Sequence, residues 1–96
     1  MFIVCWGAAS CDDHGAAHAN AGVHGIYPTL ENAKRGMTAF KDEVIADTKK
    51  DLDPDNELSF EDLDIQVYGS EAEEYYEIDY TLGTDPCEVY IKIVER

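Results

Sequence analysis

A strict alternation of apolar and polar side chains near the C-terminus constrains the fold of this chain more than any other feature. Over residues 75–82 the two alternating sets are Tyr76, Ile78, Tyr80 and Leu82 against Tyr75, Glu77, Asp79 and Thr81. Over residues 87–94 they are Cys87, Val89, Ile91 and Ile93 against Glu88, Tyr90, Lys92 and Val94. Because successive side chains of a strand point to opposite faces, this period predicts two strands with one buried and one wet face. The "GTDP" stretch between them, residues 83–86, predicts a hairpin connection.

One helix is predicted upstream, over residues 30–50. Thr29 is a favourable N-cap residue, and Pro54 makes continuation beyond the C-terminal end unfavourable. Gly36 should weaken the helix without ending it. The apolar stripe at helical spacing consists of Leu30, Ala33, Met37, Phe40 and Val44. This stripe predicts a helix that buries one face.

The remaining segments favour strands and polar connections. Residues 2–8 are apolar and rich in strand formers, residues 9–22 are small and without period, and residues 23–27 predict a short strand. A further strand is predicted where Leu63, Ile65 and Val67 alternate, followed by a polar turn. The order β-β-α-β-β-β predicts an α+β fold in which one helix packs on a mostly antiparallel sheet of about five strands. At 96 residues the chain is expected to be a single domain, 1–96.

Negative charge is concentrated in the C-terminal half. The formal net charge is −14, and the stretch from Asp51 to Ile91 holds 14 acidic residues and no lysine or arginine. The rest of the chain holds 7 acidic and 7 basic residues and is neutral. Such a chain repels nucleic acid and anionic membranes, so neither is expected to bind directly. The expected partner is a basic protein, for which a nucleic-acid-binding protein of a host is one candidate.

Tyrosines among these carboxylates favour an interface over a merely solvated surface, although acidic runs usually serve solubility. Tyrosine supplies contact area at low entropic cost. The predicted partner-binding residues are Asp51, Asp53, Asp55, Glu57, Tyr68, Glu73, Glu74, Tyr75, Glu77, Asp79, Glu88 and Tyr90. Whether edge strands also pair two copies into a homodimer is left open by the sequence.

The stretch "DLDPDNELSFED", residues 51–62, resembles an EF-hand calcium loop over about a dozen residues. Its candidate ligands are Asp51, Asp53, Asp55 and Asp62. Three departures weigh against calcium: an aspartate replaces the closing glutamate, Pro54 lies inside the loop, and a strand follows where the exit helix should begin. Ser59 with Asp62 predicts instead a capping-box-like start of one short turn. The sequence favours an acidic connector here.

A second candidate metal site lies near the N-terminus. Cys11, His14 and His18 have the spacing of zinc ligands, and Cys5 or His24 could supply a fourth. The motif lacks a second CxxC or a helical HxxxH, so it is weak. A small calcium- or zinc-binding domain is therefore the alternative function, and otherwise no cofactor is expected. No oxyanion hole or phosphate-binding loop accompanies Cys11 and His14, so no enzymatic activity is expected.

Cysteine usage and the N-terminal segment bear on the compartment. Three irregularly spaced cysteines do not suit a secreted disulfide scaffold, and "MFIVCWGAAS" has no basic leader. A cytoplasmic protein is expected, in the host cytoplasm if a phage encodes it.

The layout of the chain resembles that of small proteins encoded by phages and mobile elements. The shared features are an N-terminal strand, a "GIYPTLENAK"-like start of one helix at residues 25–34, and a C-terminal hairpin. Strongly acidic proteins of this kind include anti-CRISPR proteins and other DNA mimics, which occupy the basic groove of nucleic-acid-binding machinery. The resemblance implies a non-enzymatic inhibitor that binds a basic protein surface through its acidic half.

Overall fold

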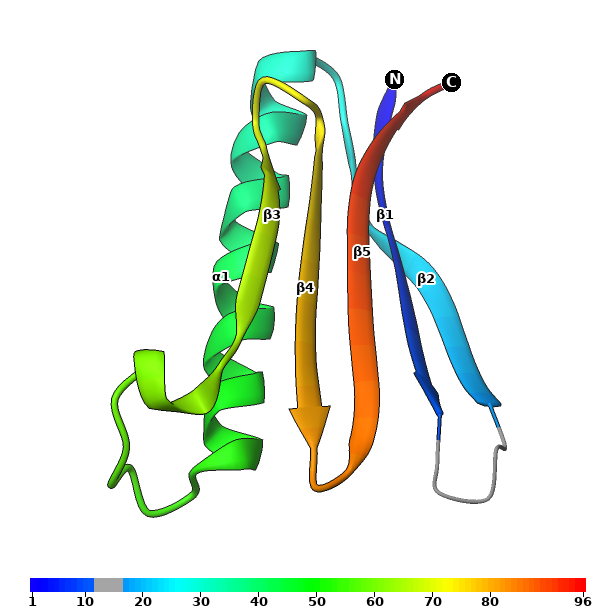
Figure 1. Cartoon of the computed structure of the whole chain (residues 1–96). Helices are drawn as coiled ribbons and strands as arrows, with labels where there is room; N and C mark the ends of the chain where they lie inside the picture. Colours follow the sequence, from blue (N-terminus) through cyan, green and yellow to red (C-terminus); the bar gives the residue numbers. More distant parts are fainter. Residues whose placement is uncertain (12–16) are drawn as a thin grey trace.

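One helix packs against one face of a five-stranded antiparallel sheet, with the strands in the spatial order β2-β1-β5-β4-β3 (Figure 1). This computed structural model describes residues 1–11 and 17–96. Its elements are β1 (Phe2–Cys11), β2 (Ala17–Tyr27), α1 (Leu30–Leu52), the short 3₁₀ helix η1 (Glu61–Leu63), β3 (Gln66–Ser70), β4 (Tyr75–Leu82) and β5 (Asp85–Glu95). The predicted α+β class and element order are confirmed.

The helix forms where its capping and apolar signals lie. The hydroxyl of Thr29 accepts the backbone N–H of Asn32 at 3.1 Å, which satisfies one of the donors that a helix N-terminus leaves open. Ala33 and Met37 of the predicted stripe are fully buried against the sheet. At the other end the N–H of Asp53 donates to the carbonyl of Lys49 at 2.9 Å. The helix therefore runs two residues past the predicted end.

The core lies between α1 and the three central strands. Its buried apolar residues are Val4, Ala33, Met37, Ile65, Tyr76, Ile78, Val89 and Ile91. Those on β4 and β5 belong to the apolar set of the alternation in each strand. At about 25 cal/mol per Å² of apolar surface removed from water, this face supplies most of the driving force for folding. Within the described residues, no helix has the length and apolarity needed to cross a membrane.

Gly36 has a packing role that the sequence did not reveal. A Cβ at this position would meet the hydroxyl and ring of Tyr27, and a Cβ at Gly25 would lie 3.1 Å from the same ring. The ring of Tyr27, at the end of β2, therefore packs between two glycines. Glycine at position 36 lowers the helix propensity of α1, but it allows the ring of Tyr27 to approach the helix closely.

The predicted loop over residues 9–22 is wrong in its described parts. β1 continues to Cys11, and β2 begins at Ala17, with Ala9 paired to Ala19 and Trp6 to Gly22. β2 is an edge strand whose side chains are mostly exposed, so no buried face imposes an apolar period on its sequence. Backbone pairing with β1, rather than side-chain pattern, makes this segment a strand.

The predicted strand over residues 63–67 begins later than expected. Leu63 ends η1, Asp64 adopts a left-handed conformation with φ 53°, and β3 begins at Gln66. Ser59 and Asp62 cause the difference, because the hydroxyl of Ser59 donates to the Asp62 carboxylate at 2.8 Å and holds a short turn. The predicted capping turn is therefore present, and Ile65 is buried as the alternation required.

Candidate protein interface

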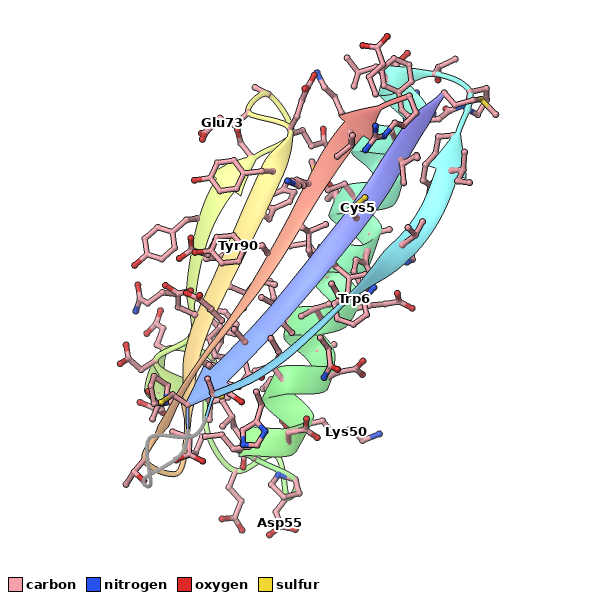
Figure 2. The ribbon with its side chains drawn as sticks, turned by 90° about the vertical axis from the view of Figure 1, so that its right-hand side faces the viewer. Cys5, Trp6, Lys50, Asp55, Glu73 and Tyr90 are labelled. Carbon is pink, nitrogen blue, oxygen red and sulfur yellow. The ribbon has the colours of Figure 1, made fainter. Side chains whose placement is uncertain are left out.

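The face of the sheet opposite α1 carries the side chains that alternate with the core, and we call it the open face. Strand register arranges them in three cross-strand rows: Ser70–Tyr75–Lys92–Cys5, Tyr68–Glu77–Tyr90–Gly7 and Gln66–Asp79–Glu88–Ala9. Figure 2 views the sheet with the helix behind it, and Tyr90 lies on the opposite side of the molecule from the helix residue Lys50. No second layer among the described residues covers this face.

Six of the predicted partner-binding residues meet on one part of the open face. They form what we call the acid–tyrosine patch: Tyr68, Tyr75, Glu77, Asp79, Glu88 and Tyr90, from β3, β4 and β5. Tyr68 is 48% exposed and Tyr90 is 42% exposed, although both are large aromatic residues. The three carboxyl side chains are half-buried between them. The patch thus combines tyrosine, which is enriched in protein interfaces, with negative charge that is complementary to a basic partner.

Three carboxyl groups within the patch crowd together. Glu77, Asp79 and Glu88 each place an oxygen within 4.8 Å of the others, and the hydroxyl of Tyr90 donates to Glu88 at 3.5 Å. Desolvation, the hydrogen bond with Glu77 and the charges of Glu77 and Glu88 raise the pKa of Asp79 to about 6. The pKa of Tyr90 is raised to about 12, first by a side-chain hydrogen bond with Glu77 and then by desolvation and the nearby carboxylates.

Asp79 also carries an unsatisfied atom. Its Oδ1 is buried and accepts no hydrogen bond from any described residue. A buried acceptor without a donor costs free energy, and a neighbouring carboxylate cannot supply the donor unless it binds a proton. Asp79 is therefore the position in the patch that gains most from an added cation or donor.

A hollow of about 560 Å³ opens beside this carboxyl group, at the end of the open face where β1 and β4 stop. Asp64, Asp79 and Glu88 contribute acidic side chains to its wall. Ala9, Ala17 and Pro86 contribute small apolar surface. The hollow is therefore amphipathic, lined by carboxyl groups and by small apolar side chains.

Two residues at this end of the face, Asp64 and Gln66, were not among the candidates predicted from the sequence. Gln66 pairs with Asp79 in the strand register, and its amide donates to Asp64 at 2.9 Å. Both residues line the hollow. The left-handed turn at Asp64 sets the direction in which the chain enters β3 and so brings both residues to the hollow. No local sequence pattern predicts that turn.

The other part of the open face is apolar. Val23 is 59% exposed and Ile26 is 60% exposed, and they pair with Cys5 and Ile3 of β1. The strand alternation predicted a wet polar face. Because β1 is apolar at both alternating sets, its pattern did not predict an exposed apolar surface. Homodimer formation stays a prediction.

The other predicted acidic residues do not extend the patch into one surface. Glu73 and Glu74 lie in the turn between β3 and β4, whereas Asp51, Asp55 and Glu57 lie at the far end of α1 and in the loop after it. Figure 2 shows Glu73 and Asp55 at opposite ends of the molecule. The predicted set of twelve is therefore divided between the patch and two separate acidic ends.

Asp53 is a structural residue, contrary to its predicted roles in partner and calcium binding. It is only 8% exposed, and its two carboxylate oxygens accept the backbone N–H groups of Glu57 and Leu58 at 3.0 and 2.9 Å. These charge-assisted bonds satisfy backbone donors just beyond the helix end. Both oxygens of the Asp53 carboxylate are thus hydrogen-bonded within the chain.

The calcium-loop candidates are not brought together. The one described group of three or more metal-binding side chains is Glu77, Asp79 and Glu88, and it includes none of Asp51, Asp53, Asp55 or Asp62. Asp62 accepts the hydroxyl and the N–H of Ser59, and Asn56 adopts a left-handed conformation with φ 55°. The loop therefore closes on its own hydrogen bonds.

The zinc-ligand candidates are separated where they are described. Cys11 pairs with Ala17, and His18 pairs with Ser10, one position along, so their side chains point to opposite faces of the sheet. His24 lies at the bulge in β2 and stacks on Phe40 with ring centroids 4.2 Å apart. His14 lies outside the described residues. The described candidates thus form no common site.

The described ion pairs leave the excess negative charge of the C-terminal half without a partner in the described residues. The described side-chain ion pairs are Arg35–Glu31 at 3.4 Å and Lys41–Asp42 at 2.7 Å, and both lie on α1. Neither involves a carboxylate of the half from Asp51 to Glu88. That half therefore projects its negative potential into solvent.

Comparison with known proteins supplies no relative. No family model, no curated protein and no solved structure matches this chain.

Proposed function

We propose that this protein is a non-enzymatic binding protein whose acid–tyrosine patch docks on a basic surface of another protein. The observation that carries the proposal is the alignment of Glu77, Asp79 and Glu88 with exposed tyrosines on the open face, where none of the three takes part in a described ion pair. Of the two functions that the sequence favours, this one has a formed surface, whereas neither predicted metal site is assembled in its described residues.

The partner surface that fits best is one built to bind nucleic acid. Carboxylates held on neighbouring strands stand about 5 Å apart across the sheet and about 7 Å apart along a strand. A rigid array of this kind presents negative charge without an ordering cost and pairs with lysine and arginine as phosphates do. A protein with a net charge of −14 is also steered toward such surfaces during diffusion. The proposal is therefore a phosphate-mimicking inhibitor or adaptor, of the anti-CRISPR or DNA-mimic kind.

The test compares two triple variants that remove the same charge from different faces. Glu77→Gln, Asp79→Asn and Glu88→Gln together neutralise the patch, while Glu31→Gln, Glu43→Gln and Asp47→Asn neutralise three exposed positions on α1. Proteins captured from a bacterial lysate at low and high salt are identified, and the affinity of each captured basic protein is measured. The patch variant should bind about tenfold or more weakly, and the helix variant should bind nearly as well as the wild type.

Salt dependence supplies the second readout. Affinity should fall linearly on a plot of log affinity against log salt, because pairing with lysine and arginine releases counterions from the partner and from the patch. Binding that is equally weakened by both triple variants would mean that net charge alone, rather than the patch, attracts the partner. Binding that ignores both salt and the variants would contradict the proposal.

A further inference from the structure

The hollow at the end of the acid–tyrosine patch suits a side chain that is both long and cationic. Its volume of about 560 Å³ far exceeds the space a bare ion needs. Ala9, Ala17 and Pro86 provide apolar surface for an aliphatic stem, and Asp79 and Glu88 provide carboxyl groups for a charged end. An arginine side chain has this division between its methylene groups and its planar guanidinium group.

We propose that this hollow is a socket for one arginine side chain of the basic partner. The inference rests on the proposed function and adds to it the residue type that the patch selects. Arginine fits better than lysine because its guanidinium group donates two parallel hydrogen bonds to carboxylate oxygens, whereas an ammonium group acts as a point charge.

Cross-strand register positions the acidic wall of the socket. Asp79 and Glu88 face each other directly on β4 and β5, so their carboxyl groups form a pair on one side of the hollow. Asp64 lies in the turn just before β3, where the side-chain amide of Gln66 donates to its Oδ1 at 2.9 Å. The wall is therefore fixed by the sheet and by one side-chain hydrogen bond, so an incoming guanidinium group meets oriented acceptors.

Asp79 contributes to this wall a carboxyl group whose Oδ1 is unsatisfied. Two carboxyl groups crowd it, and no described residue donates a hydrogen bond to it. A guanidinium group offers five N–H donors and a positive charge, which would relieve the repulsion among these carboxyl groups. No lysine or arginine occurs between Asp51 and Ile91, so the charge must come from outside this half of the chain.

Binding in the socket should release protons near pH 6. The pKa of Asp79 is raised to about 6, so part of the population is protonated there, and an adjacent cation lowers that pKa and expels the proton. The groups that face Asp79 are Glu77 on its own strand, Glu88 and Tyr90 on β5, and Gln66 and Tyr68 on β3. None of them carries a positive charge that already does this.

The experiment uses two probes of equal charge, a capped octapeptide of arginine and a capped octapeptide of lysine. Calorimetry at pH 6 and low salt should give about tenfold tighter binding for the arginine peptide. Its heat should also differ between buffers of different ionisation enthalpy, which reports proton release. In NMR spectra of the wild-type protein, the methyl resonances of Ala9 and Ala17 should shift more on addition of the arginine peptide than on addition of the lysine peptide.

Two conservative variants and one matched control test whether the preference for the arginine peptide arises in the socket. Asp79→Asn and Glu88→Gln should each bring the ratio of the two affinities close to one, while both peptides still bind in a salt-dependent manner. Glu74→Gln removes one charge from the β3–β4 turn, outside the hollow, and should leave the ratio unchanged. Far-UV circular dichroism and melting curves establish that each variant is folded.

The outcomes separate the socket from the proposed function. Salt-dependent binding with no preference for arginine, or with a preference that survives both socket variants, overturns the socket and leaves the docking proposal standing. Absence of salt-dependent binding to both peptides overturns both proposals. Stoichiometric binding of calcium or magnesium ions that is lost in Asp79→Asn, without an arginine preference, would assign the carboxyl cluster to a metal ion and would also overturn the socket.

Discussion

Strand register holds the carboxyl group of Asp79 in a position where its charge is poorly solvated. The strand alternation places it on the open face, but register pairs it with Gln66 on one side and Glu88 on the other. Its carboxyl group is thereby desolvated beside two others, and its Oδ1 has no donor among the described residues. A residue retained at a cost to stability is a typical feature of a functional position.

The protein should be more stable with asparagine at position 79 near neutral pH. The pKa of Asp79 rises from 3.8 to about 6 in the folded protein, so the folded state binds this proton more tightly than the unfolded state. The contribution of Asp79 to stability is therefore fully present below about pH 4 and is lost as pH rises through 6. Asp79→Asn should raise the free energy of unfolding by about 1 kcal/mol at pH 7.5, after allowance for solvent screening, and by little at pH 4.

Urea denaturation at pH 7.5, 6 and 4 measures this trend. Glu73→Gln, which removes the same charge at the exposed β3–β4 turn, controls for the general effect of net charge. A gain from Asp79→Asn that is the same at every pH would contradict the assigned cause.

The loop between α1 and β3 is an element held by hydrogen bonds rather than by apolar packing. Asp53 satisfies two backbone donors after the helix, and Ser59 with Asp62 holds the short turn that follows. Most of its side chains are exposed, so hydrophobic burial contributes little between residues 54 and 62. The loop fixes where β3 begins and therefore which side chains of β3 reach the open face.

Replacing the buried aspartate of this loop should destabilise the fold, and replacing its exposed neighbour should not. Asp53→Ala leaves the N–H groups of Glu57 and Leu58 without their acceptor, which should cost about 2 kcal/mol. Asp55→Ala removes an exposed carboxylate of the same loop and should change stability by less than about 0.5 kcal/mol. Urea denaturation of both variants measures the difference, and equal losses would mean that Asp53 acts only through its charge.

At the scale of the whole molecule, most of the basic residues lie on the helix and most of the acidic residues lie on the sheet and in the loop after the helix. The helix carries both described ion pairs and five of the seven basic residues, Lys34, Arg35, Lys41, Lys49 and Lys50. The sheet and the loop after the helix carry most of the carboxylates that form no described ion pair, and the helix carries three more, Glu43, Asp47 and Asp51. The molecule is therefore an electrostatic dipole whose negative side lacks internal compensation, and its own repulsion opposes folding.

Added sodium chloride should consequently stabilise the protein. The screening length falls from about 30 Å at 0.01 M to about 10 Å at 0.1 M, which weakens the repulsion among the carboxylates. The melting temperature should rise over this range, and it should rise less in the triple variant that neutralises Glu77, Asp79 and Glu88. Differential scanning calorimetry provides the measurement. A melting temperature that falls as salt is added would mean that attractive ion pairs outweigh the repulsion.

The sequence alone determined the features that depend on local spacing: the helix from its cap and apolar stripe, strands β4 and β5 from their period of two, and the concentration of negative charge. It predicted the last part of β2, residues 23–27, but not residues 17–22 or the start of β3, because an exposed edge strand carries no apolar period and a left-handed turn at Asp64 has no local signature. Only the tertiary structure decided which carboxylates meet. Cross-strand register brings Glu77, Asp79 and Glu88 together, whereas Asp53 turns inward to hold backbone donors. Register is set by the packing of the opposite face, and no stretch of sequence read by itself contains that information.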